Sequence, residues 1–263
     1  MSEEVISNDK QGIGWAPPKR GASPYEVIVP ILSTSESGSW KLEGTGFFLM
    51  TKQGVRVVTC AHVVKRLPGE RLCAIAIATT RERERVNQQT LPIKSAYCSN
   101  RIDVGWLDVE LPANTPSLPL SSRNPFFDEE IFCWDYSPAR SEPPIDGKEV
   151  FNADTWFHKG NPARFYFKNG IGHFNTSFPT MQGSSGSPIF ILNEGRFAVA
   201  GMVVGNQETT LSPSILAQRV TVKDGDNFEE NISYYLPFGV ALASDSLQKG
   251  FRQFFEPDIV TFP

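Results

Sequence analysis

Short apolar runs separated by turn residues recur along almost the whole chain, and this pattern constrains the fold more than any other feature. The runs are rich in β-branched and aromatic residues, as β-strands are. A turn that ends in Gly54 joins two of them in the manner of a β-hairpin. We therefore predict an all-β protein. The runs are 27–32, 46–50, 55–58, 73–78, 104–107, 130–134, 164–167, 189–192, 197–204 and 236–243.

A helical period occurs only near the C-terminal end of the sequence. Within 244–255, Leu247, Phe251, Phe254 and Phe255 recur at helical spacing. A serine followed by an aspartate at the start of this segment can cap a helix. We expect one C-terminal α-helix after the last strand.

Composition divides the chain into an arm and two halves. Residues 1–22 are polar and interrupted by glycine and proline, so we interpret them as an N-terminal arm. A proline-rich stretch over 111–125 is a natural link between the halves, which we place at 23–120 and 121–263. The polar stretch 205–231 is predicted to be a long loop.

The charge of the chain excludes several classes of partner. A net charge of −4 and a pI near 5.5 argue against nucleic acid and acidic membranes, because both require a basic face. No segment approaches the roughly 18 consecutive apolar residues of a membrane span, and the N-terminus has no apolar signal core. We expect a cytoplasmic protein with no nucleic-acid or membrane partner.

Cysteine spacing indicates neither a metal site nor a disulfide framework. Cys60, Cys73, Cys98 and Cys133 are widely separated and form no C-x-x-C pair. In a cytosolic protein such residues are free thiols that fill apolar space. We expect no metal ion and no cofactor.

A loop with two serines between glycines precedes the apolar run at 189–192. Gly183 and Gly186 permit backbone conformations that other residues avoid, and Pro188 fixes the backbone before the strand. Such a loop can expose the Ser185 hydroxyl and aim the amides of Gly183 and Ser185 at one point, as an oxyanion hole requires. The alternative is an ordinary Gly/Ser turn of a β-protein.

A candidate base and a candidate acid lie where apolar runs end or begin. His62 follows the run at 55–58, and Asp103 precedes the run at 104–107. Taken singly, the histidine could be a core residue and the aspartate a turn residue. Their order, histidine then aspartate then Ser185, is one of the known chain orders of a serine catalytic triad.

The segments around these three residues resemble the chymotrypsin-like (trypsin-fold) peptidases. A T-x-A-H motif ends at His62, a D-[IV]-[AG]-x-L motif starts at Asp103, and a G-x-S-G-[GS]-P motif surrounds Ser185. The closest likeness is to bacterial HtrA-like, trypsin-2-type peptidases, which share the G-[ST]-G-F segment at 44–47 and a late strand before a helix, here at 238–244. The resemblance implies two antiparallel six-stranded β-barrels with an active site between them.

The resemblance also implies a role for each of these residues. His62 would take the proton of Ser185, and Asp103 would fix the tautomer of the imidazole ring. The amides of Gly183 and Ser185 would hold the oxyanion. No acid is expected at the base of the substrate pocket, so a small or apolar side chain should precede the cleaved bond. The expected pocket residues are Pro179, Thr180, Met181, Val203, Val204, Gly205 and Asn206.

The chain departs from secreted members of that family. Val63 stands where they have a cysteine, and no Ile-Val-Gly-Gly N-terminus is present. Activation by an inserted N-terminus is therefore not expected. Ser184 replaces the acid that precedes the nucleophile in the common motif, as in intracellular and viral branches of the family. We assign no role to His158 and expect His173 to be a structural residue.

We predict a hydrolase, a serine endopeptidase that cleaves a protein or peptide through an acyl-enzyme. Narrow specificity or gating by a regulatory protein partner would restrain it. The alternative is a catalytically silent peptidase fold used as a binding or scaffold module.

Overall fold

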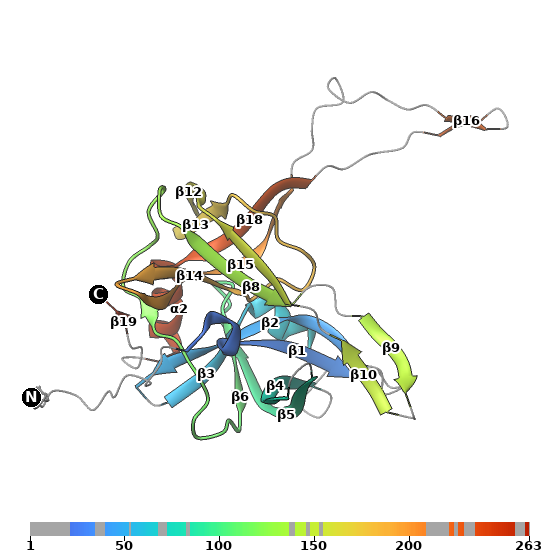
Figure 1. Cartoon of the computed structure of the whole chain (residues 1–263). Coiled ribbons are helices and arrows are strands. Elements are labelled where there is room, and N and C mark those ends of the chain that lie inside the picture. The colour runs from blue at the N-terminus through green and yellow to red at the C-terminus, as the bar shows by residue number, and fades with distance from the viewer. Residues whose placement is uncertain are drawn as a thin grey trace, which may run out of the picture.

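The chain is built mainly of β-strands, which confirms the predicted all-β class (Figure 1). The computed structural model describes residues 22–34, 40–52, 54–67, 73–82, 85–136, 140–145, 148–152, 155–208, 221–223, 226–228, 235–255 and 261–262. In chain order the elements are η1 (Pro24–Val27), β1 (Ile28–Thr34), β2 (Trp40–Thr51), β3 (Gly54–Thr59), α1 (Ala61–Arg66), β4 (Cys73–Glu82), β5 (Arg85–Cys98), β6 (Gly105–Val109), β7 (Leu120–Ser121), β8 (Ile131–Tyr136), β9 (Arg140–Ile145), β10 (Lys148–Asn152), β11 (Thr155–Gly160), β12 (Pro162–Lys168), β13 (Ile171–Thr176), β14 (Pro188–Asn193), β15 (Arg196–Glu208), β16 (Thr221–Lys223), β17 (Asp226–Phe228), β18 (Tyr235–Ala243), α2 (Ser244–Phe255) and β19 (Thr261–Phe262).

Strands β1 to β6 close into an antiparallel barrel in the order β1-β2-β3-β6-β5-β4. The predicted hairpin is present, because Met50 pairs with Val55 and the turn ends at Gly54. Apolar side chains such as Phe47 and Leu107 are fully buried within the barrel. The barrel interior belongs to a buried cluster that also includes Phe190 and Met202 of the second half.

The second half forms a sheet whose main path is β11-β8-β14-β15-β18-β13-β12. Neighbouring strands on this path are antiparallel. The path has seven strands, because Asn161 separates β11 from β12. Strands β11 and β12 are the two ends of the path, and the hydrogen bond from the Ser177 amide to the Asn161 carbonyl at 2.9 Å extends the β12–β13 pairing to the residue that joins them.

Strand β15 extends into the stretch that the sequence predicted to be a loop from residue 205. Its pairing with β18 continues from Gly205 opposite Val240 to Glu208 opposite Tyr235. Backbone pairing sustains this extension even though the side chains are polar, which is why hydropathy gave no sign of it. Residues 209–220, 224–225 and 229–231 of the predicted loop, and 1–21 of the predicted arm, lie outside the described residues.

Helix α2 occupies the segment predicted from the helical period and packs between the two halves. Leu247 and Phe251 belong to the same buried cluster as the interior of the first barrel. The small surface of Gly250 faces Val104 and Ile102, close to Asp103. Neither helix in the described part of the chain is long and apolar enough to span a membrane.

Candidate active site

The candidate base and acid meet where two paired strands of the first barrel end. Strand β3 ends at Thr59, and β6 begins at Gly105, its pairing partner. Asp103 lies just before β6, and His62 lies in the first turn of α1, a short helix that the sequence did not predict. The imidazole Nδ1 lies 2.7 Å from Asp103 Oδ2, and the His62 amide donates to Asp103 Oδ1 at 2.9 Å.

This two-point contact orients the histidine ring. A carboxylate accepts from the imidazole when Nδ1 carries the proton, which leaves Nε2 as the proton acceptor of a neutral ring. Both side chains are about one-third exposed, at 38% for His62 and 32% for Asp103, so the ring remains open to a substrate. The pair can therefore supply an oriented general base.

The turn that carries Ser185 depends on two glycines with positive φ. The φ angles are 100° at Gly183 and 92° at Gly186, a region that side chains with a Cβ rarely adopt. A Cβ on Gly186 would also overlap the carbonyl of Thr45 in β2. Ser185 is held against the same strand, because its carbonyl accepts a hydrogen bond from the Thr45 amide at 2.9 Å.

Gly44 is the point at which the serine turn and the histidine helix approach each other. A Cβ at this position would lie 2.9 Å from the Ser185 carbonyl oxygen and 2.8 Å from a methyl group of Val63, the residue after His62. Only a glycine permits both segments to pack on β2 here. The serine turn and the helix that carries His62 therefore pack on the same part of β2.

Two amides of the serine turn remain as candidate oxyanion donors. The turn uses the amides of Ser184, Gly186 and Ser187 in backbone hydrogen bonds. Within the part of the chain that the structure describes, the amides of Gly183 and Ser185 donate to no backbone group. Donors left unused in this way can bind an oxyanion without breaking an existing hydrogen bond.

Cys60, His62 and Asp103 place one ligand-type atom each within 4.8 Å of one another. Cys60 is fully buried and its Sγ donates to the Val203 carbonyl at 3.2 Å. Burial, together with the nearby charge of Asp103, raises the pKa of this thiol well above its usual value. The group that a metal would need is a thiolate, so this cluster fits a histidine base and its partner better than a metal site.

A family model of the trypsin-like peptidase domain matches residues 44–202. The matched segment contains His62, Asp103 and Ser185. The chain belongs to the trypsin-like peptidase family.

Solved structures of serine proteases share the fold of this trypsin-like peptidase. The active form of the Rv3671c protease from M. tuberculosis has a TM-score of 0.53 at 14% identity, over 98% of this chain and 97% of that chain. The inactive form of the Rv3671c protease has a TM-score of 0.51 at 15% identity, over 88% and 89%. The serine endoprotease from Yersinia pestis has a TM-score of 0.51 at 13% identity, over 91% and 69%. No curated protein sequence matches the chain.

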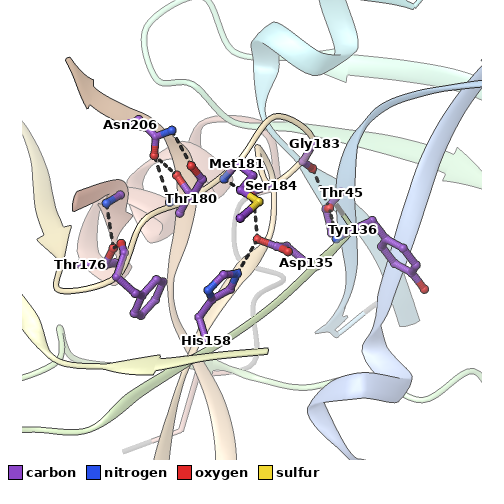
Figure 2. A network of polar contacts seen from close by, with 12 residues as sticks. Thr45, Asp135, Tyr136, His158, Thr176, Thr180, Met181, Gly183, Ser184 and Asn206 are labelled. Carbon is purple, nitrogen blue, oxygen red and sulfur yellow. Dashed lines mark hydrogen bonds and ion pairs between the residues drawn. The ribbon is translucent and has the colours of Figure 1, made fainter. Parts of the chain in front are cut away.

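Three of the predicted pocket residues of this trypsin-like peptidase, Thr180, Gly205 and Asn206, are joined by hydrogen bonds. The Thr180 amide donates to Asn206 Oδ1 at 3.1 Å, and Asn206 Nδ2 donates to the Thr180 carbonyl at 2.5 Å (Figure 2). Thr180 Oγ1 also donates to the Gly205 carbonyl at 3.0 Å. Met181 is exposed, whereas Val203 is buried and uses its backbone to support the serine turn.

Sequence reasoning missed a buried polar network behind the nucleophile (Figure 2). Ser184 Oγ donates to Asp135 Oδ2 at 2.5 Å and accepts from the Met181 amide at 2.9 Å. His158 Nε2 lies 3.2 Å from the same carboxylate oxygen, an ion-pair distance outside hydrogen-bond geometry. Asp135 is fully buried, and these contacts serve its Oδ2, whereas its Oδ1 makes no hydrogen bond among the described residues.

The alternation of β8 contained a signal for this network. Ile131, Cys133 and Asp135 occupy the buried phase of the strand. A carboxylate in a buried phase needs partners, and these come from the serine turn and β11. His158, to which the sequence assigned no role, is one of them.

His173 lies in β13 and hydrogen-bonds locally, as a structural histidine would. Its Nδ1 lies 2.9 Å from the Ile171 carbonyl, and its ring stacks on Tyr166. Burial lowers the pKa of this imidazole, with the charge of Lys168 acting in the same direction. The side chain also lines a cleft that includes Asp103.

Proposed function

We propose that the chain is a serine endopeptidase in which His62, Asp103 and Ser185 form the catalytic triad. The observation that carries the proposal is the contact of the Asp103 carboxylate with both Nδ1 and the backbone amide of His62. A surface histidine without a catalytic role has no need for a carboxylate that fixes both its ring and its backbone amide. The turn around Ser185 also supports the proposal, because it packs on β2 at Gly44, where the helix that carries His62 packs as well.

In the proposed reaction, Ser185 Oγ attacks the carbonyl carbon of the substrate while His62 Nε2 takes the hydroxyl proton. The amides of Gly183 and Ser185 donate to the oxyanion. Breakdown of the tetrahedral intermediate breaks the peptide bond, and the proton on His62 goes to the departing amine. Water then attacks the carbonyl carbon of the acyl-enzyme and gives a proton to His62. When the ester bond breaks, the acid is released and the proton on His62 returns to Ser185 Oγ, which restores the hydroxyl.

The hydrogen bonds between Thr180 and Asn206 favour a small side chain before the cleaved bond. They join the two walls of the predicted pocket, so a large side chain would have to break them. Gly239 lies against both Thr180 and Thr176, which narrows the same region further. Narrow specificity of this kind would limit unwanted proteolysis by a cytoplasmic endopeptidase without a regulatory partner. A cytoplasmic location and control of the activity by a partner protein are further parts of the proposal.

A fluorophosphonate probe tests the proposed nucleophile, because it reacts only with an activated serine. We expect covalent labelling of the unaltered chain and none of Ser185→Ala. Ser122→Ala removes an exposed serine elsewhere and should label normally. Absence of labelling in the unaltered chain, or labelling that survives Ser185→Ala, would contradict the triad and favour a scaffold role.

A further inference from the structure

The cleft beside Asp103 is basic, although the chain as a whole is acidic. It has a volume of about 580 Å³, and Arg101, Arg164 and Lys168 line it. A neighbouring cleft of about 600 Å³ shares Arg101 and adds Lys249 and Arg252. Five cations thus converge here in a chain with a net charge of −4.

These cations are available to an external anion. Among the described residues, none of the five takes part in an ion pair, whereas Lys41, Lys94, Arg123 and Lys159 do. The one acid that lines either cleft is Asp103, and its two oxygens are engaged by His62. The charge of the cleft is therefore not neutralised by its own walls.

Burial keeps His173 neutral near pH 7, so the positive charge of the cleft comes from arginine and lysine. The guanidinium of Arg164 lies 5.7 Å from the centre of the Tyr166 ring, and both side chains line the cleft. Arginine side chains bind carboxylates through paired hydrogen bonds.

The cleft is placed to receive a peptide that reaches Ser185. Its wall includes Val204, Gly205 and Asn206 of β15, and the last two also contact Thr180 in the proposed pocket. Strand β14 pairs with β15 only as far as Met202, and the backbone of Val203 bonds to Gly186 and Ser187 of the serine turn, so β14 does not cover β15 beyond Val203. An extended peptide on this edge would carry its side chains past the cations.

We propose that this basic cleft selects substrates with acidic side chains next to the cleaved bond, on the Asp103 side of Ser185. The proposal rests on the proposed peptidase function, because it assigns a substrate class to the same site. Carboxylate side chains are the matching chemistry, since each gains charge-assisted hydrogen bonds at little cost to exposed groups. Local attraction would oppose the general repulsion between an acidic protein and an acidic peptide.

Binding to the Ser185→Ala variant tests the cleft without requiring turnover. Labelled peptide pairs that differ only by Glu or Gln at one position would be compared by fluorescence polarisation. We expect the Glu peptide to bind about tenfold more tightly at low salt, and this difference to shrink as salt rises from about 50 to about 500 mM. Equal binding at every position would overturn the proposal.

Charge reversal identifies the cations responsible. In Arg101→Glu/Arg164→Glu/Lys168→Glu the preference should change to peptides with Lys at the same position. Lys52→Glu changes a charge in the β2–β3 turn, outside both clefts, and should leave the preference unaltered. A preference that survives the triple reversal would contradict the assignment.

Fluorophosphonate labelling distinguishes the two possible failures. Labelling of Ser185 without any Glu preference would retain the peptidase and exclude the acidic substrate. Glu-selective binding without labelling would retain the basic cleft as a binding site and exclude the triad.

Discussion

Asp103 is the residue on which the proposed base depends most directly. Its carboxylate contacts both the ring and the amide of His62, so it fixes the position of the side chain and the tautomer together. Gly183 and Gly186 do the same for the nucleophile by giving its turn two positive φ angles. At the residue scale, one carboxylate thus orients the proposed base, and two glycines orient the proposed nucleophile.

Asp103→Asn should abolish most of the activity while leaving the fold intact. The amide preserves the shape of the side chain but favours the wrong tautomer of His62, which lowers kcat about 10⁴-fold in triads of this type. Steady-state hydrolysis and thermal unfolding would be measured together. A loss of activity below about tenfold, with unchanged stability, would exclude Asp103 as the orienting acid.

Gly186→Ala and Gly195→Ala separate backbone strain from steric overlap. Both glycines have positive φ, but a Cβ at Gly195 would meet open space, whereas at Gly186 it would overlap Thr45. We expect Gly195→Ala to lower the free energy of unfolding by about 1–2 kcal/mol with normal fluorophosphonate labelling. Gly186→Ala should lower the free energy of unfolding by more than this and should abolish fluorophosphonate labelling. Equal effects of the two variants would contradict a special role for the serine turn.

Three elements combine to support the serine turn from behind. Thr45 in β2 donates through Oγ1 to the Gly183 carbonyl at 2.8 Å and accepts from the Tyr136 amide at 3.1 Å. Strand β8 also supplies Asp135, and β11 supplies His158 (Figure 2). The turn is therefore fixed by contacts with strands of both halves as well as by its own glycines.

Ser184→Ala should weaken both stability and catalysis, because it leaves Asp135 buried without its hydroxyl donor. We expect the free energy of unfolding to fall by about 1–3 kcal/mol. The kcat should fall more than KM rises, since the oxyanion donors on either side would lose their fixed positions. Asp135→Asn, which can still accept from Ser184, should have a smaller effect on kcat than Asp135→Ala. A change in stability alone, with normal kcat, would limit the network to a structural role.

At the scale of the whole molecule, the candidate site combines residues of both halves, which share one buried cluster that runs from Phe47 in β2 to Phe190 in β14. The first barrel supplies His62 and Asp103, and the second sheet supplies Ser185 and the pocket walls. Helix α2 belongs to the same buried cluster as the interior of the barrel, which links the end of the chain to the neighbourhood of Asp103. Substitutions that weaken the packing of α2 should therefore lower the free energy of unfolding and also alter the cleft beside Asp103.

Acidification should destabilise the molecule partly through His173 in the cleft. Burial lowers its pKa in the folded chain, so the unfolded chain binds the proton more readily. Stability is then retained above the unfolded value near 6.5 and decreases as pH falls through that value. The groups facing this ring include Arg101, Lys168 and Asp103. Denaturant unfolding between about pH 5 and pH 8 should show a smaller decrease for His173→Gln than for the unaltered chain. An identical decrease would exclude this histidine.

The sequence by itself indicated the all-β class, the C-terminal helix and the candidate triad, but it missed strands such as β5, β11 and β13. Local patterns suffice for these features, because alternation, helical period and glycine at positive φ act over a few neighbouring residues. The order of His62, Asp103 and Ser185, in motifs that each lie within one short segment, predicted the peptidase family that the family model confirms.

Only the tertiary structure decided what surrounds the triad. Asp135 and Ser184 are far apart in the sequence, and so are Thr180 and Asn206, so no local pattern reveals that they touch. The basic cleft likewise combines cations from the segment before Asp103, from β12 and from α2. The net charge did not reveal the basic cleft, because it is a sum over the whole chain. Recognition depends instead on which charged side chains the fold brings together.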